Sequence, residues 1–142
     1  MTEITAADLA LLAFAREARE KAYAPYSKFR VGAAVMAADN EIYQGCNVEN
    51  ASYGATLCAE RSAAAACIAT GRREIVAVAV VGDSDAPTPP CGCCRQFLAE
   101  FGPDMRVVMG GATDAVMVMR LDELLPEAFV RGYLDQDEFD GD

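Results

Sequence analysis

The sequence predicts a single α/β domain in three layers, with helices on both faces of a mixed five-stranded sheet. Segments with helical periodicity alternate with short apolar segments along the 142 residues. Residues 75–81 are continuously apolar, as expected of a strand that is covered on both faces. Only residues 110–114 separate the last two strand-like segments, which is too short for a parallel crossover. We therefore expect the last two strands to be antiparallel.

The first helix is predicted from its start and stop signals. Thr5 is a candidate N-cap, and Asp8 stands three residues later as a variant of the capping box. Apolar residues then recur with helical spacing to about residue 22. Pro25 forbids continuation, because proline lacks the N–H that a helix interior requires.

A hairpin and a polar loop are expected next. Residues 29–38 and 41–47 form two strands around the turn signal of Asp39 and Asn40. Residues 47–54 are polar and carry one carboxylate and two carboxamides, which suits a binding loop beside a rigid scaffold. An ordinary turn with self-bonded asparagines explains the same composition.

The remaining elements follow from periodicity and from glycine and proline positions. They are a helix at 58–69, a strand at 75–81, a helix at 91–101, strands at 106–109 and 115–120, and a short helix at 121–125. No linker or internal repeat divides the chain. We expect one domain at residues 1–134 and an acidic, solvated tail at residues 135–142.

Composition narrows the possible functions. The chain carries 12 basic and 22 acidic residues, a net charge of −10, which argues against a nucleic-acid partner. It has no apolar run long enough to span a membrane and no positively charged leader, so we expect a cytoplasmic protein with reduced thiols. The expected substrate is small and is not a polyanion.

The complete absence of histidine excludes several catalytic devices. Ser-His-Asp and Cys-His machinery cannot form within the chain, and neither can an H-E-x-x-H zinc site. The phosphate-binding and dinucleotide-binding glycine motifs are also missing. The chemistry must therefore rest on the cysteines and carboxylates.

Three cysteines and one glutamate form the pattern of a catalytic zinc site. Cys91 and Cys94 make a C-x-x-C whose sulfurs lie about one helical turn apart, and Cys58 supplies a third thiolate. A catalytic zinc takes three protein ligands and leaves its fourth position to water. Glu60 is then the base that acts on that water. The pattern predicts a hydrolase that removes an amino group.

Two arginines strengthen this interpretation. Three thiolates leave a bound Zn²⁺ with a net negative charge, which weakens it as a Lewis acid. Arg61 and Arg95 each follow a key residue directly and could donate hydrogen bonds to the sulfurs, which would withdraw that charge.

Other uses of the six cysteines remain open at this stage. Disulfides are disfavoured in a reducing compartment. A closed structural zinc site would take Cys46, Cys67 or Cys93 as a fourth ligand. These three residues are otherwise interpreted as small hydrophobic side chains.

Several motifs together resemble the small homotetrameric zinc-dependent cytidine deaminases, within the cytidine/deoxycytidylate deaminase superfamily. They are Cys58-Ala-Glu60-Arg61, Pro90-Cys91-Gly92-Cys93-Cys94-Arg95-Gln96, the run from Tyr26 to Val35, and the run from Gly45 to Tyr53. The resemblance extends to Phe129. Cys93 departs from the usual small or polar residue at its position.

The resemblance implies a reaction and its catalytic residues. Cys58, Cys91 and Cys94 would hold Zn²⁺, and Glu60 would carry the proton from zinc-bound water to N3 of cytosine. The resulting hydroxide would attack C4 and ammonia would leave, which converts cytidine and deoxycytidine into uridine and deoxyuridine in pyrimidine salvage.

The resemblance also implies the contacts of the substrate. Asn47 and Glu49 would bind the ribose 3′-hydroxyl, Phe29 would pack against the base, and the backbone of Ala59 would meet the pyrimidine carbonyl. In a homotetramer with shared sites, Phe129 of a neighbouring subunit would reach the substrate, and Tyr53 would act across the same interface. Without the resemblance, core packing is the preferred interpretation of Phe29 and Phe129.

Two alternative functions are open. A cytosine-containing antibiotic such as blasticidin S is a related substrate, but its deaminase lacks the sugar-binding run that residues 47–50 provide here. A structural zinc in a nucleic-acid or protein interaction module is the alternative outside the enzyme class, and a fourth cysteine ligand would support it. The preference between ribose and deoxyribose does not follow from the sequence.

Overall fold

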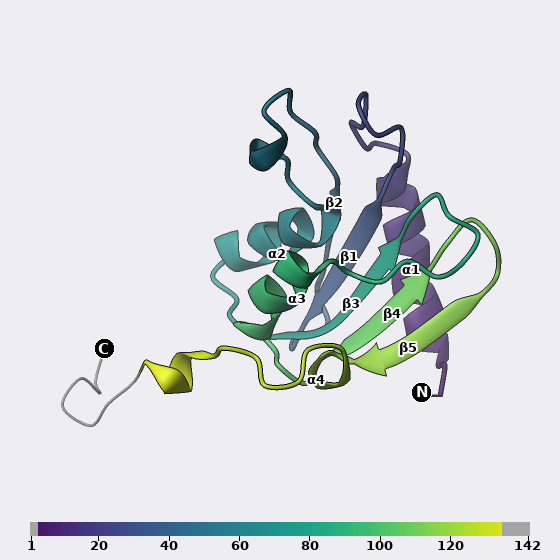
Figure 1. The fold of residues 1–142 in the computed structure, drawn as a ribbon. Helices are drawn as coiled ribbons and strands as arrows, with labels where there is room; N and C mark the ends of the chain where they lie inside the picture. Colours follow the sequence, from purple (N-terminus) through teal and green to yellow (C-terminus); the bar gives the residue numbers. More distant parts are fainter. Residues whose placement is uncertain (1–2, 135–142) are drawn as a thin grey trace.

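The computed structural model describes residues 3–134 and has the predicted α/β architecture (Figure 1). Its elements are α1 (Ala6–Arg19), β1 (Gly32–Ala37), β2 (Ile42–Cys46), α2 (Ala59–Ala69), β3 (Ile75–Val81), α3 (Gly92–Ala99), β4 (Arg106–Gly110), β5 (Val116–Arg120) and α4 (Leu121–Leu124), with short 3₁₀ turns at Tyr53–Ala55 and Arg131–Tyr133. The predicted acidic tail at residues 135–142 lies outside the described residues. No described helix has the length and apolar character needed to cross a membrane.

The five strands form one mixed sheet in the order β2-β1-β3-β4-β5. Only the β3–β4 pair is parallel, and the other three pairs are antiparallel. The antiparallel pairing predicted for the last two strands is therefore confirmed.

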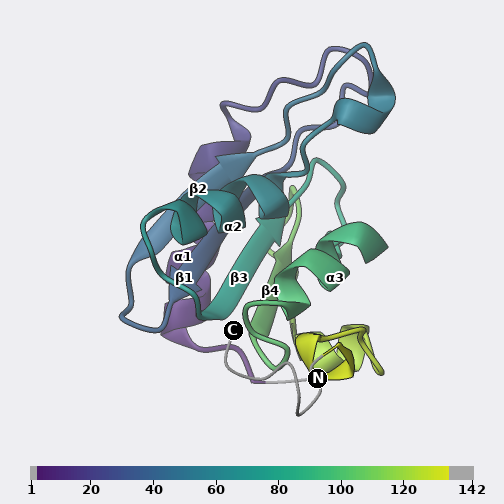
Figure 2. The same cartoon turned by 90° about the vertical axis from the view of Figure 1, so that its left-hand side faces the viewer.

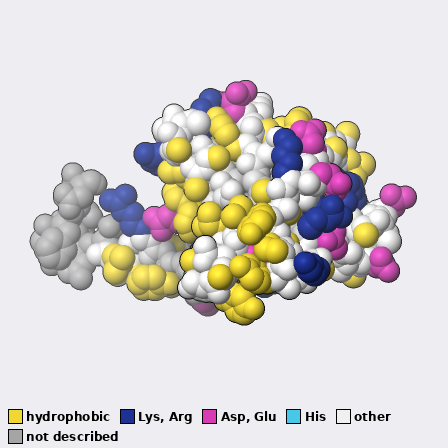
Figure 3. Space-filling model, turned by 90° about the horizontal axis from the view of Figure 1, so that it is seen from above, with side chains coloured by type: hydrophobic (Ala, Val, Ile, Leu, Met, Phe, Trp, Pro, Cys, Tyr) yellow, Lys and Arg dark blue, Asp and Glu magenta, His cyan; other side chains and the backbone are white. Residues whose placement is uncertain are grey.

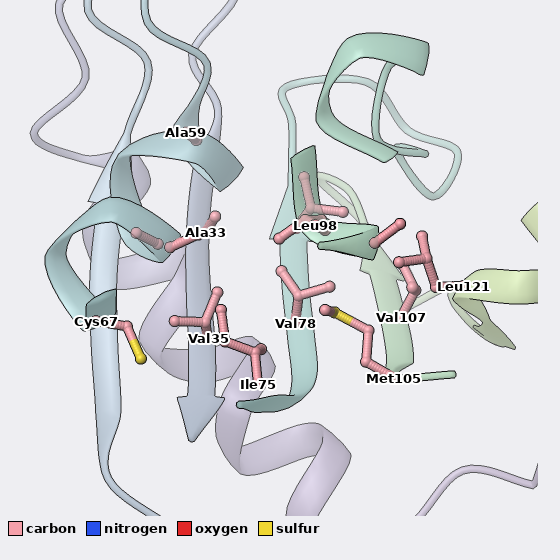
Figure 4. Close-up of a cluster of buried hydrophobic side chains, with 14 of the residues drawn as sticks. Ala33, Val35, Ala59, Cys67, Ile75, Val78, Leu98, Met105, Val107 and Leu121 are labelled. Carbon is pink, nitrogen blue, oxygen red and sulfur yellow. The ribbon is translucent and has the colours of Figure 1, made fainter. Parts of the chain in front are cut away.

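Helices cover both faces of this sheet, which makes the three predicted layers (Figures 1 and 2). On one face α1 packs through Leu11 and Leu12, which are fully buried with strand residues such as Val108. On the other face α2 and α3 cover a second cluster that includes Val78 and Leu98 (Figure 4). Because α2 and α3 pack on the same buried cluster, their positions relative to each other are fixed by the sheet.

Glycine allows α2 to lie very close to the sheet. A Cβ atom on Gly45 of β2 would stand 2.4 Å from the backbone nitrogen of Ala63 and 2.7 Å from the carbonyl oxygen of Ala59. No side chain fits there, so the helix rests directly on the strand. This contact fixes the height of the first turn of α2 above the sheet.

The strand register brings three connections to one edge of the sheet. Gly32 at the start of β1 pairs with Cys46 at the end of β2 and with Val81 at the end of β3. The segments that precede β1, follow β2 and follow β3 therefore meet at this edge. The segments before β1 and after β2 project beyond the sheet in Figure 2.

The hairpin strands are shorter than predicted at this edge. Residues 29–31 precede β1 as irregular chain, because side chains take their backbone groups. Asp83 accepts the N–H of Arg30 at 2.8 Å, and Asn47 accepts the N–H of Val31 at 2.9 Å. The ends of the helices at residues 22 and 101 were also predicted too late, since α1 and α3 end at Arg19 and Ala99.

Candidate active site

Three cysteine sulfurs converge between the starts of two helices. Cys58 is the N-cap of α2, Cys91 is the N-cap of α3, and Cys94 lies in the first turn of α3. Their Sγ atoms all lie within 4.8 Å of one another. Sulfurs that share a tetrahedral zinc with bonds of about 2.3 Å stand about 3.8 Å apart, so small adjustments suffice for binding.

The donor set fits zinc. Thiolates are ligands that zinc prefers, and helix N-termini stabilise the negative charge that a ligand sulfur must carry. Among the described residues, the cluster has three members and includes neither Cys46, Cys67 nor Cys93. All six cysteines are unpaired, which excludes the disulfide interpretation. The group of three matches a site with an open position better than a closed one.

The surroundings of Cys58 favour its thiolate form. Arg61 donates from Nη2 to the Sγ of Cys58 at 3.5 Å and to the carbonyl oxygen of Thr56 at 3.3 Å. Hydrogen bonding with Cys94 and with Arg61 lowers the pKa of Cys58 to about 5 against the opposing effect of burial. The same interaction with Cys58 raises the pKa of Cys94, so negative charge concentrates on Cys58.

Arg61 and Arg95, which each follow a candidate site residue, bind different kinds of group. Arg61 contacts a sulfur directly, as described above. The described hydrogen bonds of Arg95 go to backbone oxygens instead, at 2.8 Å to Pro90 from Nε and 2.8 Å to Leu124 from Nη1. Arg95 therefore joins the loop before α3 to the end of α4, and the expectation that it donates to a sulfur has no support in this geometry.

Glu60 lies one residue into α2 and is only 5% exposed. Burial raises the pKa of Glu60 to about 7, and the negative charge of Cys58 acts in the same direction. The side chain is thus a buried carboxyl beside the sulfur cluster, in a position to exchange a proton within a confined space.

A cavity of about 180 Å³ opens beside the cluster. The first residues of α2, Cys58 to Glu60, form one wall. Asn47, Thr88 and Cys91 also line the cavity. We call this space the inner cavity. It can hold one small planar group next to both Glu60 and the sulfurs.

A second cavity of about 240 Å³ adjoins the first, and we call it the outer cavity. Thr56 lines both spaces, so they are neighbours. The outer cavity is lined by Tyr26, Ser27, Glu49 and Tyr53. Figure 3 looks onto the molecule from above, and hydrophobic side chains gather in the middle of this face.

Glu49 is a fixed anion in the outer cavity. Its carboxylate accepts hydrogen bonds from the backbone N–H groups of Tyr26 and Ser27 at 2.9 and 3.1 Å, and from the hydroxyl of Ser27. The Ser27 hydroxyl contributes most to holding the pKa of Glu49 below its ordinary value. A carboxylate held this way can accept a hydrogen bond from a ligand hydroxyl.

Asn47 is largely occupied by the protein itself. Its Oδ1 accepts from the N–H of Val31, and its Nδ2 donates to the carbonyl oxygen of Phe29, both at 2.9 Å. One hydrogen of Nδ2 remains for a ligand in the inner cavity. The role of this asparagine in fixing residues 29–31 had no signal in the sequence.

Of the three aromatic residues that were predicted to bind the substrate, only Tyr53 lines one of the two cavities. Tyr53 lines the outer cavity and its ring meets Tyr26 edge-on, with 5.8 Å between centroids. Phe29 lies outside the two linings, and its ring lies beside the backbone of Gly82. Phe129 stacks on Tyr133 in the segment after α4 and is 58% exposed. In one subunit, therefore, Phe129 does not reach the site.

Sequence reasoning missed two threonines. Thr56 joins the two cavities and Thr88 lines the inner one. Neither residue has a distinctive pattern, because both lie in loops whose paths the local sequence does not define. The pair Pro89-Pro90 marks the loop that carries Thr88, but not the direction of its side chain.

Comparisons with known proteins agree with this arrangement. The family model of the cytidine and deoxycytidylate deaminase zinc-binding region matches residues 5–111. A cytidine deaminase of Halalkalibacterium halodurans is 49% identical over 120 residues, which cover 84% of this chain and 91% of the relative. A cytidine deaminase of Mycobacterium tuberculosis is 44% identical over 115 residues, which cover 81% of this chain and 84% of the relative.

Solved crystal structures of cytidine deaminases share the fold of this chain. The crystal structure of cytidine deaminase from Burkholderia pseudomallei superposes with a TM-score of 0.83 at 48% identity, covering 89% of this chain and 100% of that one. The crystal structure of cytidine deaminase from Mycobacterium tuberculosis superposes with a TM-score of 0.74 at 41% identity, covering 85% of this chain and 95% of that one.

Proposed function

This chain belongs to the cytidine and deoxycytidylate deaminase zinc-binding family, and on that premise we propose that it hydrolyses cytidine and deoxycytidine to uridine, deoxyuridine and ammonia. One observation carries the proposal: the inner cavity places a buried glutamate and three converging sulfurs beside a space for a planar ring. Such a reaction belongs to pyrimidine salvage.

The sulfurs of Cys58, Cys91 and Cys94 would hold the zinc. A zinc ion with three protein ligands supplies a Lewis acid and an open position at which the pKa of water falls. Arg61 donates to the sulfur of Cys58 and would thereby reduce the negative charge that this ligand gives to a bound zinc. Cys46, Cys67 and Cys93 take no part in this proposal.

Glu60 moves the protons. Its carboxylate accepts a proton from the attacking water and delivers it to N3 of the cytosine ring, which makes C4 more electrophilic. The oxygen adds to C4 as a hydroxyl, and Glu60 then takes the proton of this hydroxyl and passes it to the amine. The C4–N bond breaks, ammonia leaves, and the oxygen stays on C4 as the carbonyl of uridine. The burial of Glu60 favours this use, because a confined carboxyl gives up its proton to the ring and not to bulk water.

The start of α2 also orients the base. The backbone N–H of Ala59 belongs to the first turn, where N–H groups have no partner within the helix. Ala59 lines the inner cavity, so this N–H can donate to the pyrimidine carbonyl. The base then lies with C4 toward the sulfurs and its carbonyl toward the helix start.

The adjoining cavities suit the two halves of a nucleoside. With the base in the inner cavity, the sugar extends into the outer one, so its 3′-hydroxyl can meet the free hydrogen of Asn47 from the inner side and Glu49 from the outer side. Phe29 packs against the base from the rim. A free cytosine would leave the outer cavity unfilled, so we propose a nucleoside as the substrate.

We further propose a cytoplasmic homotetramer that binds no nucleic acid. The net charge of −10 disfavours a polyanionic partner, and the reducing cytoplasm keeps the thiols available. The exposed Phe129 would enter the site of a neighbouring subunit, with Tyr53 beside that interface.

A direct assay tests the proposal. Zinc-loaded protein is mixed with cytidine at neutral pH, and uridine is measured by the fall in cytidine absorbance together with the release of ammonia. We expect turnover with cytidine and deoxycytidine and one zinc per chain by metal analysis. Full zinc occupancy without turnover of either nucleoside would contradict the proposed function and would favour a structural zinc.

A further inference from the structure

Phe29 lies directly against the backbone of Gly82, which follows β3. A Cβ atom on Gly82 would stand 2.8 Å from Cε1 and Cζ of the Phe29 ring and 2.5 Å from Oγ1 of Thr88. Both distances are shorter than a Cβ tolerates, so the absence of a side chain lets the ring and Thr88 come together. Thr88 lines the inner cavity, so Gly82 places the ring of Phe29 close to a residue of that lining, although the ring is not itself part of the lining.

The backbone around Phe29 is held by side chains from two other segments. Asn47 binds the carbonyl oxygen of Phe29 and the N–H of Val31. Between these contacts, Asp83 accepts the N–H of Arg30 at 2.8 Å. The guanidinium of Arg30 also binds Asp83, with Nη2 3.3 Å from Oδ1 and Nε 3.4 Å from Oδ2. Asp83 thus holds both the backbone and the side chain of Arg30.

Asp83 is itself fixed by the end of α1. Arg19 donates from Nη1 to the carbonyl oxygen of Gly82 at 3.0 Å, and its Nε lies 4.0 Å from Oδ1 of Asp83. Partial burial raises the pKa of Asp83, but the hydrogen bonds from Arg30 outweigh this and keep the pKa below its ordinary value. The carboxylate is therefore charged at neutral pH and connects the end of α1 and the segment before β1 to the loop after β3.

We propose that Asp83 is a positioning residue for substrate binding, which acts by holding Arg30 and so keeping the Phe29 ring seated on Gly82. Asp83 lines neither cavity, so its effect must pass through the segment at residues 29–31. The inference rests on the proposed function, because it takes the Phe29 ring as a surface for the base. Without Asp83, substrate binding must order the segment, and affinity falls. Turnover of bound substrate is unaffected, because Cys58 and Glu60 belong to α2.

Proteolysis tests the holding of the segment independently of activity. Lys28 and Arg30 are trypsin sites within or next to it, and we expect cleavage there to be about tenfold faster in Asp83→Ala, as the loss of a charged hydrogen bond implies. The matched control is Asp39→Ala, which removes the Asp39–Arg72 pair at the far end of the hairpin and should leave these two cleavages unchanged. Wild-type cleavage rates in Asp83→Ala would overturn the inference.

Steady-state kinetics with cytidine test the expected loss of substrate affinity when Asp83 is replaced. We expect Asp83→Ala to raise KM about tenfold with kcat within about twofold of wild type, and Asp39→Ala to keep both values. Asp83→Asn retains an oxygen for the N–H of Arg30 and should recover part of the affinity. In a Phe29→Ala background, the substitution at Asp83 should change KM no further, since the ring that it positions is gone.

The outcomes separate this inference from the proposed function. Lack of turnover in the wild type would defeat the proposed function and the substrate-binding role of Asp83 with it. Turnover in the wild type, combined with an unchanged KM in Asp83→Ala or with full additivity in the Phe29→Ala background, would defeat the inference alone. A lower kcat at unchanged KM would show a general structural role instead.

Discussion

At the scale of single residues, the start of α2 gives four neighbours four separate tasks. Cys58 has extended backbone geometry as the N-cap and can turn its sulfur toward α3. Ala59 offers a free backbone N–H, Glu60 is buried, and Arg61 reaches back to the sulfur of Cys58. These tasks differ because the first residues of a helix point in successive directions about its axis. A short motif can therefore supply ligand, donor, base and counter-charge together.

Replacing Glu60 with glutamine tests its role as the proton carrier. The substitution keeps the shape of the side chain but removes the carboxylate, so kcat should fall by roughly 10²- to 10⁴-fold. Zinc content and thermal stability should stay near the wild-type values. Glu100→Gln, an exposed glutamate at the end of α3, is the matched control. A near-normal rate in the Glu60 variant would remove this residue from the mechanism.

Arg61→Gln tests the tuning of charge at the sulfurs. The substitution removes a donor to Cys58 and leaves the ligand set more negative, so kcat/KM or zinc affinity should fall by about 10- to 100-fold. Turnover and competition with a chelator measure the two effects. Arg73→Gln is the control, because the described hydrogen bonds of Arg73 go to the backbone oxygens of Ile68 and Arg72, at the other end of α2. Equal kinetics and equal zinc affinity in both variants would show that the charge argument is wrong.

At the scale of elements, α1 is fastened at its start by a buried carboxylate. Thr5 and Asp8 form the predicted capping box, with the N–H of Thr5 donating to Asp8 at 2.8 Å. Asp8 also accepts from Nε and Nη2 of Arg106 on β4, at 3.0 and 2.5 Å. One side chain that is 4% exposed thus caps the helix and ties it to the sheet. The sequence predicted the cap but not the partner 98 residues away.

Asp8→Asn should lower the free energy of unfolding by about 2 kcal/mol at pH 7, through the loss of charged hydrogen bonds. Burial raises the pKa of Asp8, but Arg106 and Thr5 outweigh it and lower the pKa overall. A lowered folded-state pKa stabilises the protein above the unfolded pKa of about 4, and this contribution is lost as the pH falls. The difference in the free energy of unfolding between the wild type and Asp8→Asn should therefore become smaller as the pH falls below about 5.

Urea unfolding of both proteins at several pH values measures this difference. Subtracting the two curves cancels other acid-sensitive groups, which both proteins share. Asp122→Asn, which breaks the exposed Arg120–Asp122 pair, should cause no measurable change. A difference between wild type and Asp8→Asn that stays constant with pH would contradict the assigned role of the charge.

The same scale shows what the sequence can predict and what it cannot. Periodicity predicted every helix and strand, and the short link at residues 110–114 predicted the antiparallel pair. Local spacing also predicted that Cys91 and Cys94 converge. The error at residues 29–31 has a tertiary cause, since Asn47 and Asp83 take backbone groups that an apolar sequence would otherwise give to a strand. Contacts of this kind depend on the assembled fold.

The sequence also did not predict which groups the side chains near the loops bind. Arg95 follows a metal-ligand candidate just as closely as Arg61 follows Glu60, yet it binds carbonyl oxygens of Pro90 and Leu124. The difference arises because α4 lies beside α3, a packing that the local sequence does not contain. Sequence pattern thus predicted which residues lie near the sulfurs better than what each one touches.

At the scale of the whole molecule, the chain after α4 leaves large apolar side chains exposed. Phe129, Tyr133 and Leu134 are 58%, 62% and 66% exposed. The carbonyl oxygen of Phe129 accepts from Gln96 of α3 at 2.6 Å, and the segment then extends beyond the helices (Figure 1). Tyr53 is exposed at the opening of the outer cavity as well. Apolar surface of this extent is a feature of protein interfaces, and a second copy of the chain is the partner that the proposed tetramer requires.

If subunits share active sites, two defective variants should complement each other. Glu60→Gln removes the base but keeps Phe129, whereas Phe129→Ala should keep the base and raise KM for cytidine. In co-expressed mixed oligomers, some sites combine an intact Glu60 with an intact Phe129 from the neighbour. At low cytidine concentration, these mixtures should therefore exceed the average activity of the two parents, and light scattering should give the mass of a tetramer. Activity equal to that average, or a monomeric mass, would show that each chain forms its site alone.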